Sequence, residues 1–133
     1  MEKYRNFLSA SILLLVPALA LILYSCLTPS ILVTREQNTG DELFNRHDYN
    51  GAAEHYEKML SASSKLGIYR NLSMEAAVCR KVANCLEMEG RYEQALDYVS
   101  RALKLDSADN NLLGRIEDYR HTGKIYIYMG SYY

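Results

Sequence analysis

Apolar residues recur at helical spacing through most of the chain, and no segment alternates apolar and polar residues as a half-buried strand does. The clearest example runs from Ala95 to Leu105, where apolar residues fall mainly three or four positions apart. Asp97 and Arg101 lie on its polar side at the spacing of a favourable ion pair. Ser107 to Asn111 is rich in helix-starting residues and predicts a loop. The pattern therefore predicts an all-α protein.

One short pattern of small and bulky residues occurs three times along the chain. In the middle copy, a small residue, Ala83, is followed at fixed offsets by Leu86, Gly90, Tyr92, Ala95, Val99 and Ala102. The same offsets from Gly40 give Leu43, His47, Tyr49, Ala52, Tyr56 and Met59, and those from Gly123 give Tyr126, Gly130 and Tyr132. A small residue lets two antiparallel helices approach closely, and the bulky residues fill the space between them. Gly90 and Gly130 are expected to end helices, because glycine readily adopts the left-handed conformation.

This pattern resembles the tetratricopeptide repeat, whose signature corresponds in the middle copy to Cys79, Val82, Ala83, Leu86, Ala95, Val99 and Ser107. The third copy begins similarly, with Tyr119, Thr122, Gly123 and Tyr126. Cys79 replaces the usual aromatic residue and Ser107 the proline, and the copies are spaced more widely than the roughly 34 residues of the family. The extra residues, at 61–73 and 107–114, predict longer first helices or longer connections.

The resemblance covers residues 35–133 and implies a right-handed α-solenoid of stacked antiparallel helix pairs. About two and a half repeats are expected. The third copy is incomplete and lacks its second helix, which would leave Ile125, Tyr126, Tyr128 and Met129 uncovered. We expect either a longer protein that continues the repeat or a face that contacts a partner or a second copy.

Residues 1–27 differ from the rest, because no charged residue occurs between Phe7 and Leu27. As a helix this run is about 30 Å long, enough to cross the hydrocarbon core of a bilayer. The segment is therefore interpreted as a transmembrane anchor or a cleaved secretory signal, followed by a tether at residues 28–34. Lys3 and Arg5, on the short leading side, predict a cytoplasmic N-terminus and an exported repeat domain.

Leu23, Ser25 and Cys26 also resemble the bacterial lipoprotein signal, although Tyr24 is bulkier than its usual occupant. That resemblance implies cleavage before Cys26 and lipidation of its thiol. In the alternative interpretation, Cys26 is an apolar residue near the end of a membrane helix. All of these alternatives place the repeat domain on the periplasmic or surface side of a bacterial membrane.

No enzyme or metal site is predicted from the spacing of the His, Cys and acidic residues. The chain has a net charge of −1, without the concentrated basic field that nucleic-acid binding needs. His47, His55 and His121 have no partner at a metal-ligand spacing, and there is no glycine-rich phosphate loop. Cys79 and Cys85 are too far apart on one helix for a disulfide, and we expect them to be small buried residues. We predict no catalytic residue, metal or cofactor.

The family resemblance also implies a binding groove on the concave surface. Its positions lie three residues before and one after each small residue, and they are occupied by Gln37, Asp41, Arg80, Asn84, Arg120 and Lys124. Arginine and asparagine together suit a carboxylate, through charge-assisted hydrogen bonds. In the alternative interpretation these are solvated charges paired with Glu75, Glu87 or Glu117.

The predicted function is therefore protein or peptide binding at a membrane, with a partner that presents an acidic or carboxylate-bearing segment. The alternative is the sensing segment of a larger membrane-bound signalling protein, such as a histidine kinase or a transcriptional regulator.

Overall fold

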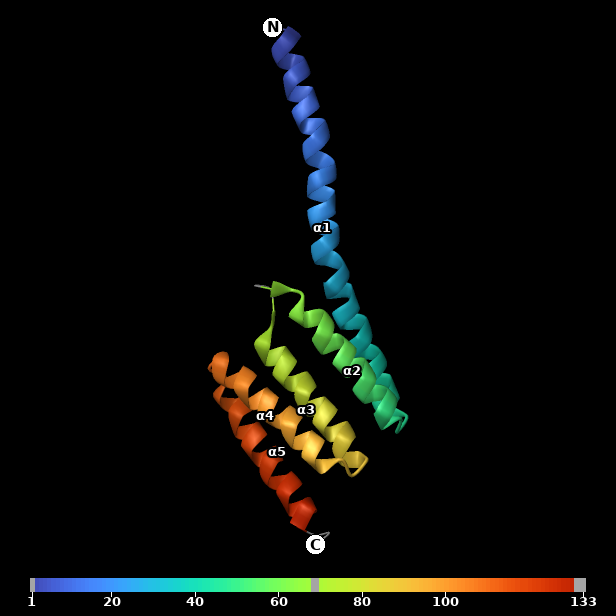
Figure 1. Ribbon diagram of the computed structural model, residues 1–133, viewed down its shortest axis with the longest axis vertical. Coiled ribbons are helices and arrows are strands. Elements are labelled where there is room, and N and C mark those ends of the chain that lie inside the picture. Colours follow the sequence, from blue (N-terminus) through green and yellow to red (C-terminus); the bar gives the residue numbers. More distant parts are fainter. Residues whose placement is uncertain (1, 68–69, 131–133) are drawn as a thin grey trace.

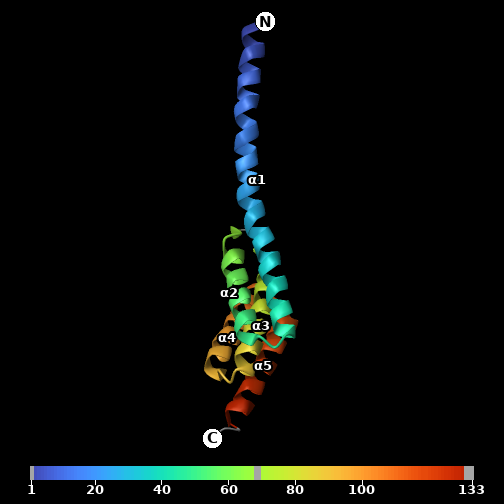
Figure 2. The same cartoon turned by 90° about the vertical axis from the view of Figure 1, so that its right-hand side faces the viewer.

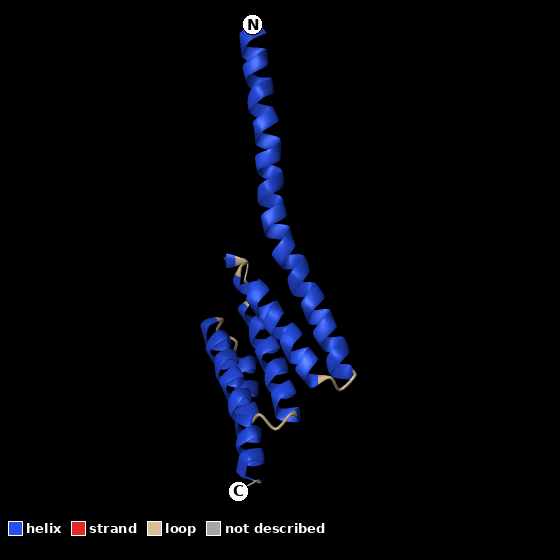
Figure 3. Cartoon of the chain, turned by 45° about the vertical axis from the view of Figure 1, so that its right-hand side comes forward, coloured by secondary structure: helices blue, strands red, loops and turns tan. Residues whose placement is uncertain are grey.

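The computed structural model describes the backbone of residues 2–67 and 70–130, and, within the first helix, the side chains of residues 17, 19–21 and those from Thr28 onward. The described helices are α1 (Glu2–Asn45), α2 (Tyr49–Ser64), α3 (Leu72–Met88), α4 (Tyr92–Ala108) and α5 (Leu112–Gly130). Each helix packs beside the next in an antiparallel arrangement (Figure 1), and α3 also contacts α5. No strand occurs in these residues (Figure 3), so the all-α prediction is confirmed.

The turns within the first two helix pairs share one backbone conformation. His47, between α1 and α2, has φ of 63°, and Gly90, between α3 and α4, has φ of 74°. The two residues occupy the same offset in the repeat, so the predicted left-handed turn is confirmed at Gly90. Side-chain caps start α2 and α3, since Asp48 accepts a hydrogen bond from Gly51 N and Asn71 accepts one from Met74 N, whereas the N-cap residue of α4, Arg91, makes no such bond.

The core lies between the helices of each pair and is built from the repeated offsets. Ala52 and Ala95, the predicted small residues of the second helices, are both fully buried. Tyr56 and Val99, at the next bulky offset, are only 2% and 1% exposed. The Tyr56 ring lies directly on Gly40, where an added Cβ would be 2.6 Å from Tyr56 Cε1. Glycine at this position therefore sets the close approach of α1 and α2.

Helix α1 runs without interruption through residues 28–34, which the sequence suggested as a tether. Gly40 is the first glycine of the chain, and Pro29 lies inside the helix. No helix-terminating glycine therefore separates the N-terminal segment from the first repeat helix. The N-terminal half of α1 extends away from the other helices (Figures 1 and 2).

The predicted signal or anchor lies largely outside the described side chains, and Cys26 is among the residues that are not described. Within the part of the chain that the structure describes, no helix has a stretch both long and apolar enough to cross a membrane.

The connection between α4 and α5 is shorter than the loop predicted at Ser107 to Asn111. Ser107 and Ala108 belong to α4, and the turn is closed by the hydrogen bond from Asn111 N to Asp106 O, 2.8 Å long. Helix α5 then packs on α4, and Ile125 is fully buried. The expectation that Ile125 is uncovered is therefore wrong, because this residue faces the preceding repeat.

Candidate functional site

A hollow of about 440 Å³ lies between α3 and α5, within the size range of ligand pockets. Its lining consists of Arg80, Asn84, Glu117, Arg120, His121 and Lys124. Four of these are predicted groove residues, brought together because α3 and α5 carry the same repeat offsets. Glu117 and His121 were not predicted to line a groove, and they add a carboxylate and an imidazole to the hollow.

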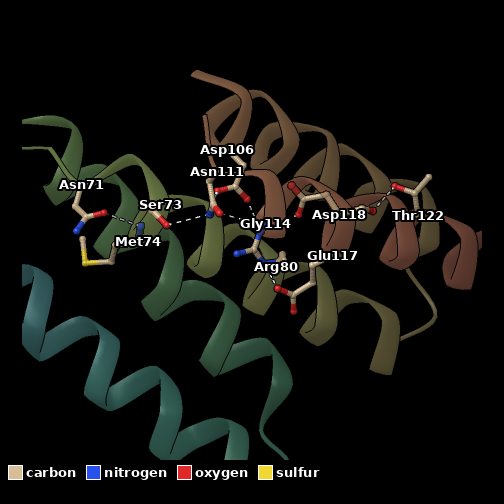
Figure 4. A network of polar contacts seen from close by, with 10 residues as sticks. All are labelled: Asn71, Ser73, Met74, Arg80, Asp106, Asn111, Gly114, Glu117, Asp118 and Thr122. Atoms are coloured by element: carbon tan, nitrogen blue, oxygen red, sulfur yellow. Dashed lines mark hydrogen bonds and ion pairs between the residues drawn. The ribbon is translucent and has the colours of Figure 1, made fainter. Parts of the chain in front are cut away.

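Arg80 lines the hollow and is also tied to the interior of the repeat by ion pairs (Figure 4). Its Nη1 lies 2.7 Å from Asp106 Oδ2 and 2.9 Å from Asp118 Oδ1. The side chain of Arg80 is 12% exposed, and both of these carboxylates are fully buried. Nε also lies 3.7 Å from Glu117 Oε2. One cation thus joins α3 to α4 and α5, and neighbouring carboxylates neutralise its charge.

Asn111 hydrogen-bonds the second carboxylate oxygen of Asp106 and also caps the N-terminus of α5. Its Nδ2 donates to Asp106 Oδ1 at 2.8 Å and to Ser73 Oγ at 3.2 Å. Its Oδ1 accepts from Gly114 N at 3.1 Å, as a helix cap does. Gly114 leaves room for this arrangement, because a Cβ there would lie 2.2 Å from Asp106 Oδ2.

Asp118 is the member of this network with an unpaired carboxylate oxygen among the described residues. Its Oδ2 is buried without a hydrogen-bond partner among the described residues. Burial raises the pKa of this carboxyl group above its ordinary value, and Asp106 adds to the increase while Arg80 opposes it. Two buried carboxylates share one guanidinium here, which favours a bound proton.

Glu87 of α3 contacts two side chains of α5 that also line the hollow. Lys124 Nζ lies 2.8 Å from Glu87 Oε2, and His121 Nε2 contacts Oε1 of the same carboxylate. Lys124 Nζ also lies 5.7 Å from the centroid of the Tyr128 ring. The positive charge of Lys124 is therefore already paired, as the alternative interpretation of these residues predicted.

Arg120 and Asn84 also line the hollow, and their side chains are available to bind a ligand. Among the described residues, neither side chain makes a hydrogen bond or an ion pair, and Arg120 is exposed on α5. Arg120 can donate to an anion through its planar guanidinium, and Asn84 can donate through its amide. These two side chains are therefore the hydrogen-bond donors of the hollow that no described residue engages.

The two groove residues predicted on α1, Gln37 and Asp41, do not line this hollow. Asp41 instead accepts hydrogen bonds from Tyr56 Oη at 2.6 Å and from Lys81 Nζ at 2.5 Å. Burial raises the pKa of the Asp41 carboxyl group, but the bonds from Lys81 and Tyr56 outweigh this and hold its pKa below the ordinary value. Asp41 therefore links α1 to α2 and α3.

The buried positions of Asp106 and Asp118 were not predicted from the sequence. A signal for Asp118 existed, since it lies five residues before Gly123, where the middle copy has the core residue Val78. A carboxylate at a core offset requires a buried partner, and Arg80 supplies it.

Other polar clusters in the described residues show no metal or redox chemistry. No group of three or more His, Cys, Asp or Glu side chains is placed there to hold a metal ion. Cys79 and Cys85 are buried free thiols, as predicted, and burial raises their pKa values to about 11 and about 12. Both thiols are therefore protonated and unreactive at neutral pH.

Comparisons with known proteins agree with this fold. Residues 76–109, which span most of α3 and all of α4, match the family profile described as tetratricopeptide repeat. The crystal structure of the TPR domain of FLU from Arabidopsis is similar, with a TM-score of 0.69 and 19% sequence identity, over 77% of this chain and 83% of that chain. No curated protein sequence matches the chain significantly.

At this identity the structural match shows the fold alone. Together with the matched repeat, it supports a tetratricopeptide-repeat protein. Repeats of this kind generally serve as scaffolds that bind protein partners.

Proposed function

We propose that this protein is a non-catalytic scaffold that binds an acidic or carboxylate-bearing segment of a partner protein in the hollow between α3 and α5. The observation that carries the proposal is the presence of Arg120 and Asn84 in one hollow of about 440 Å³. Neither side chain has a partner among the described residues. A guanidinium and an amide together match the two oxygens of a carboxylate.

Arg120 is the main anion-binding residue in this proposal, and Arg80 is a secondary contact. Arg80 already contacts Asp106, Asp118 and Glu117, so a ligand would compete with these carboxylates for it. Lys124 is paired with Glu87 in the same way. Glu117 also lines the hollow and repels an anion, which makes Arg120 all the more necessary.

The Arg120→Ala variant is expected to weaken binding of an acidic peptide with a free C-terminal carboxylate by about 10-fold or more, because a charge-assisted hydrogen bond is lost. Fluorescence anisotropy with a fluorescein-labelled peptide and the full chain measures this change. Arg115→Ala is the matched control, since Arg115 is also on α5 but does not line the hollow. Equal binding of a peptide in which the C-terminal carboxylate and the acidic side chains are all replaced by amides, or unchanged binding by Arg120→Ala, would contradict the proposal.

We also propose that the N-terminal segment holds this scaffold at or beyond a bacterial membrane. The support is the uncharged run between Phe7 and Leu27, preceded by Lys3 and Arg5. Mass spectrometry of the mature chain distinguishes the two forms of attachment. Loss of residues 1–25 with a lipid-sized gain on Cys26 identifies a lipoprotein, and an intact Met1 in the membrane fraction identifies an anchor. Recovery in the soluble fraction would overturn the membrane proposal.

Self-association through α5 is the third part of the proposal. Its support is the large apolar surface that α5 exposes on the side away from α4, where Leu113 is 79% exposed and Leu112 and Tyr119 are each 61% exposed.

A further inference from the structure

Glu117 is the lining residue that anion binding alone does not explain. Its side chain is 54% exposed, and its ion pair with Arg80 Nε is 3.7 Å long. That separation is longer than a hydrogen bond, so the Glu117 carboxylate can still accept hydrogen bonds from a ligand. Figure 4 shows this carboxylate beside Arg80. The hollow therefore offers an acceptor for a cation as well as donors for an anion.

The charges around the hollow are balanced. The lining cations are Arg80, Arg120 and Lys124. The carboxylates that line the hollow or contact these cations are those of Glu87, Asp106, Glu117 and Asp118. The cations are thus matched by at least as many negative charges, even with Asp118 protonated. A segment that carries only negative charges would gain no long-range attraction here, and a ligand that carries both signs is favoured.

The contacts between α3 and α5 give the order of the charged groups along the hollow. Arg80 and Glu117 contact each other at one end, and Glu87 and Lys124 contact each other at the other end. Arg120 lies between Glu117 and Lys124 on α5, almost one helical turn after Glu117. Residues three apart on a helix have Cβ atoms about 5–6 Å apart. A donor for an anion and an acceptor for a cation therefore lie side by side.

We propose that the hollow takes the C-terminal residue of a partner protein when that residue is lysine or arginine. The proposal rests on the proposed function and specifies the residue that is bound. The α-carboxylate accepts hydrogen bonds from Arg120 and Asn84, and the side-chain cation of the same residue pairs with Glu117. A C-terminal lysine carries its two charges at opposite ends of a four-carbon stem, which suits the spacing of Arg120 and Glu117.

Two peptides that differ only in their last residue test this preference. Both end in a free carboxylate, one with lysine and the other with norleucine, which keeps the stem and removes the cation. The full wild-type chain is expected to bind the lysine peptide about 5-fold more tightly, as one partly exposed ion pair provides. Fluorescence anisotropy with peptides labelled at their N-termini measures both affinities.

The Glu117→Gln variant assigns the preference to one carboxylate. It is expected to bind the two peptides equally, and to bind the norleucine peptide more tightly than the wild type does, because a like charge beside the peptide carboxylate is removed. A damaged fold would instead weaken the binding of both peptides. Glu93→Gln is the matched control, since it removes the same charge from an exposed residue of α4 that does not line the hollow. It should keep the 5-fold preference.

The results separate this proposal from the proposed function. Equal binding of the two peptides by the wild type, with both weakened by Arg120→Ala, would overturn the preference for a basic residue and leave carboxylate binding standing. A lysine preference that persists in Glu117→Gln would overturn the role of Glu117. Failure of both peptides to bind the wild type would overturn the proposed function as well.

Discussion

Replacing Arg80 with methionine is expected to lower the free energy of unfolding by about 3–5 kcal/mol, because it leaves buried carboxylates without their cation. Asp106 and Asp118 are fully buried, and the Arg80 side chain is only 12% exposed. Methionine retains much of the aliphatic packing, so the loss reports mainly on charge. Denaturant unfolding of the full chain, followed by circular dichroism, measures the change.

Arg120→Met is the matched control for this substitution. Arg120 is exposed and makes no ion pair among the described residues, so its replacement should change stability by less than about 0.5 kcal/mol. Similar unfolding free energies for the two variants would show that Arg80 does not join α3 to α4 and α5.

The stability deficit of Arg80→Met should also depend on pH. Burial already raises the pKa of Asp118, and removal of Arg80 takes away the cation that opposes this increase. A carboxyl group whose folded pKa exceeds its unfolded value lowers stability as the pH rises through that range. The deficit should therefore be smallest near about pH 4 and largest near neutral pH. A deficit that is independent of pH would indicate a packing defect instead.

Replacing Tyr56 with alanine is expected to cost about 3–5 kcal/mol of folding stability, the range found for large aromatic residues in cores. Tyr56 is 2% exposed, and its ring fills the space over Gly40. The substitution also removes the hydrogen bond from Tyr56 Oη to Asp41 Oδ1. The α1–α2 pair would lose its central contact.

Tyr56→Phe separates the two contributions, since it keeps the ring and removes only the hydroxyl. Its expected cost is about 0.5–1.5 kcal/mol, the net value of one hydrogen bond. Thermal or denaturant unfolding of both variants gives the comparison. If alanine and phenylalanine cost the same, the ring over Gly40 does not hold the first helix pair together.

Features that repeat along the chain were predictable from the sequence. The offsets from Gly40 and Ala83 correctly placed Ala52, Tyr56 and Val99 in the core, because the same local spacing encodes the same packing in each copy. The same offsets brought four of the six predicted groove residues to one hollow.

Features that occur only once were not predictable in this way. Arg80 contacts Asp106 and Asp118, which are 26 and 38 residues away, and no other copy has this network within the described part of the chain. The sequence therefore presented Arg80 as a groove cation, although its charge is largely used within the fold. The sequence also indicated a tether at residues 28–34, and in the structure these residues are part of helix α1.

Binding of an acidic segment in the hollow between α3 and α5 is tested most directly by nuclear magnetic resonance. The isotopically labelled full chain is titrated with the free-carboxylate peptide, and two side-chain amides are compared. Asn84 lines the hollow and Gln37 does not, although both occupy groove offsets of the repeat. Shifts at the Asn84 amide and at Arg120 Nε–H, with Gln37 unchanged, are the predicted result. Shifts at Gln37 with Asn84 and Arg120 unchanged, or no shifts at all, would contradict it.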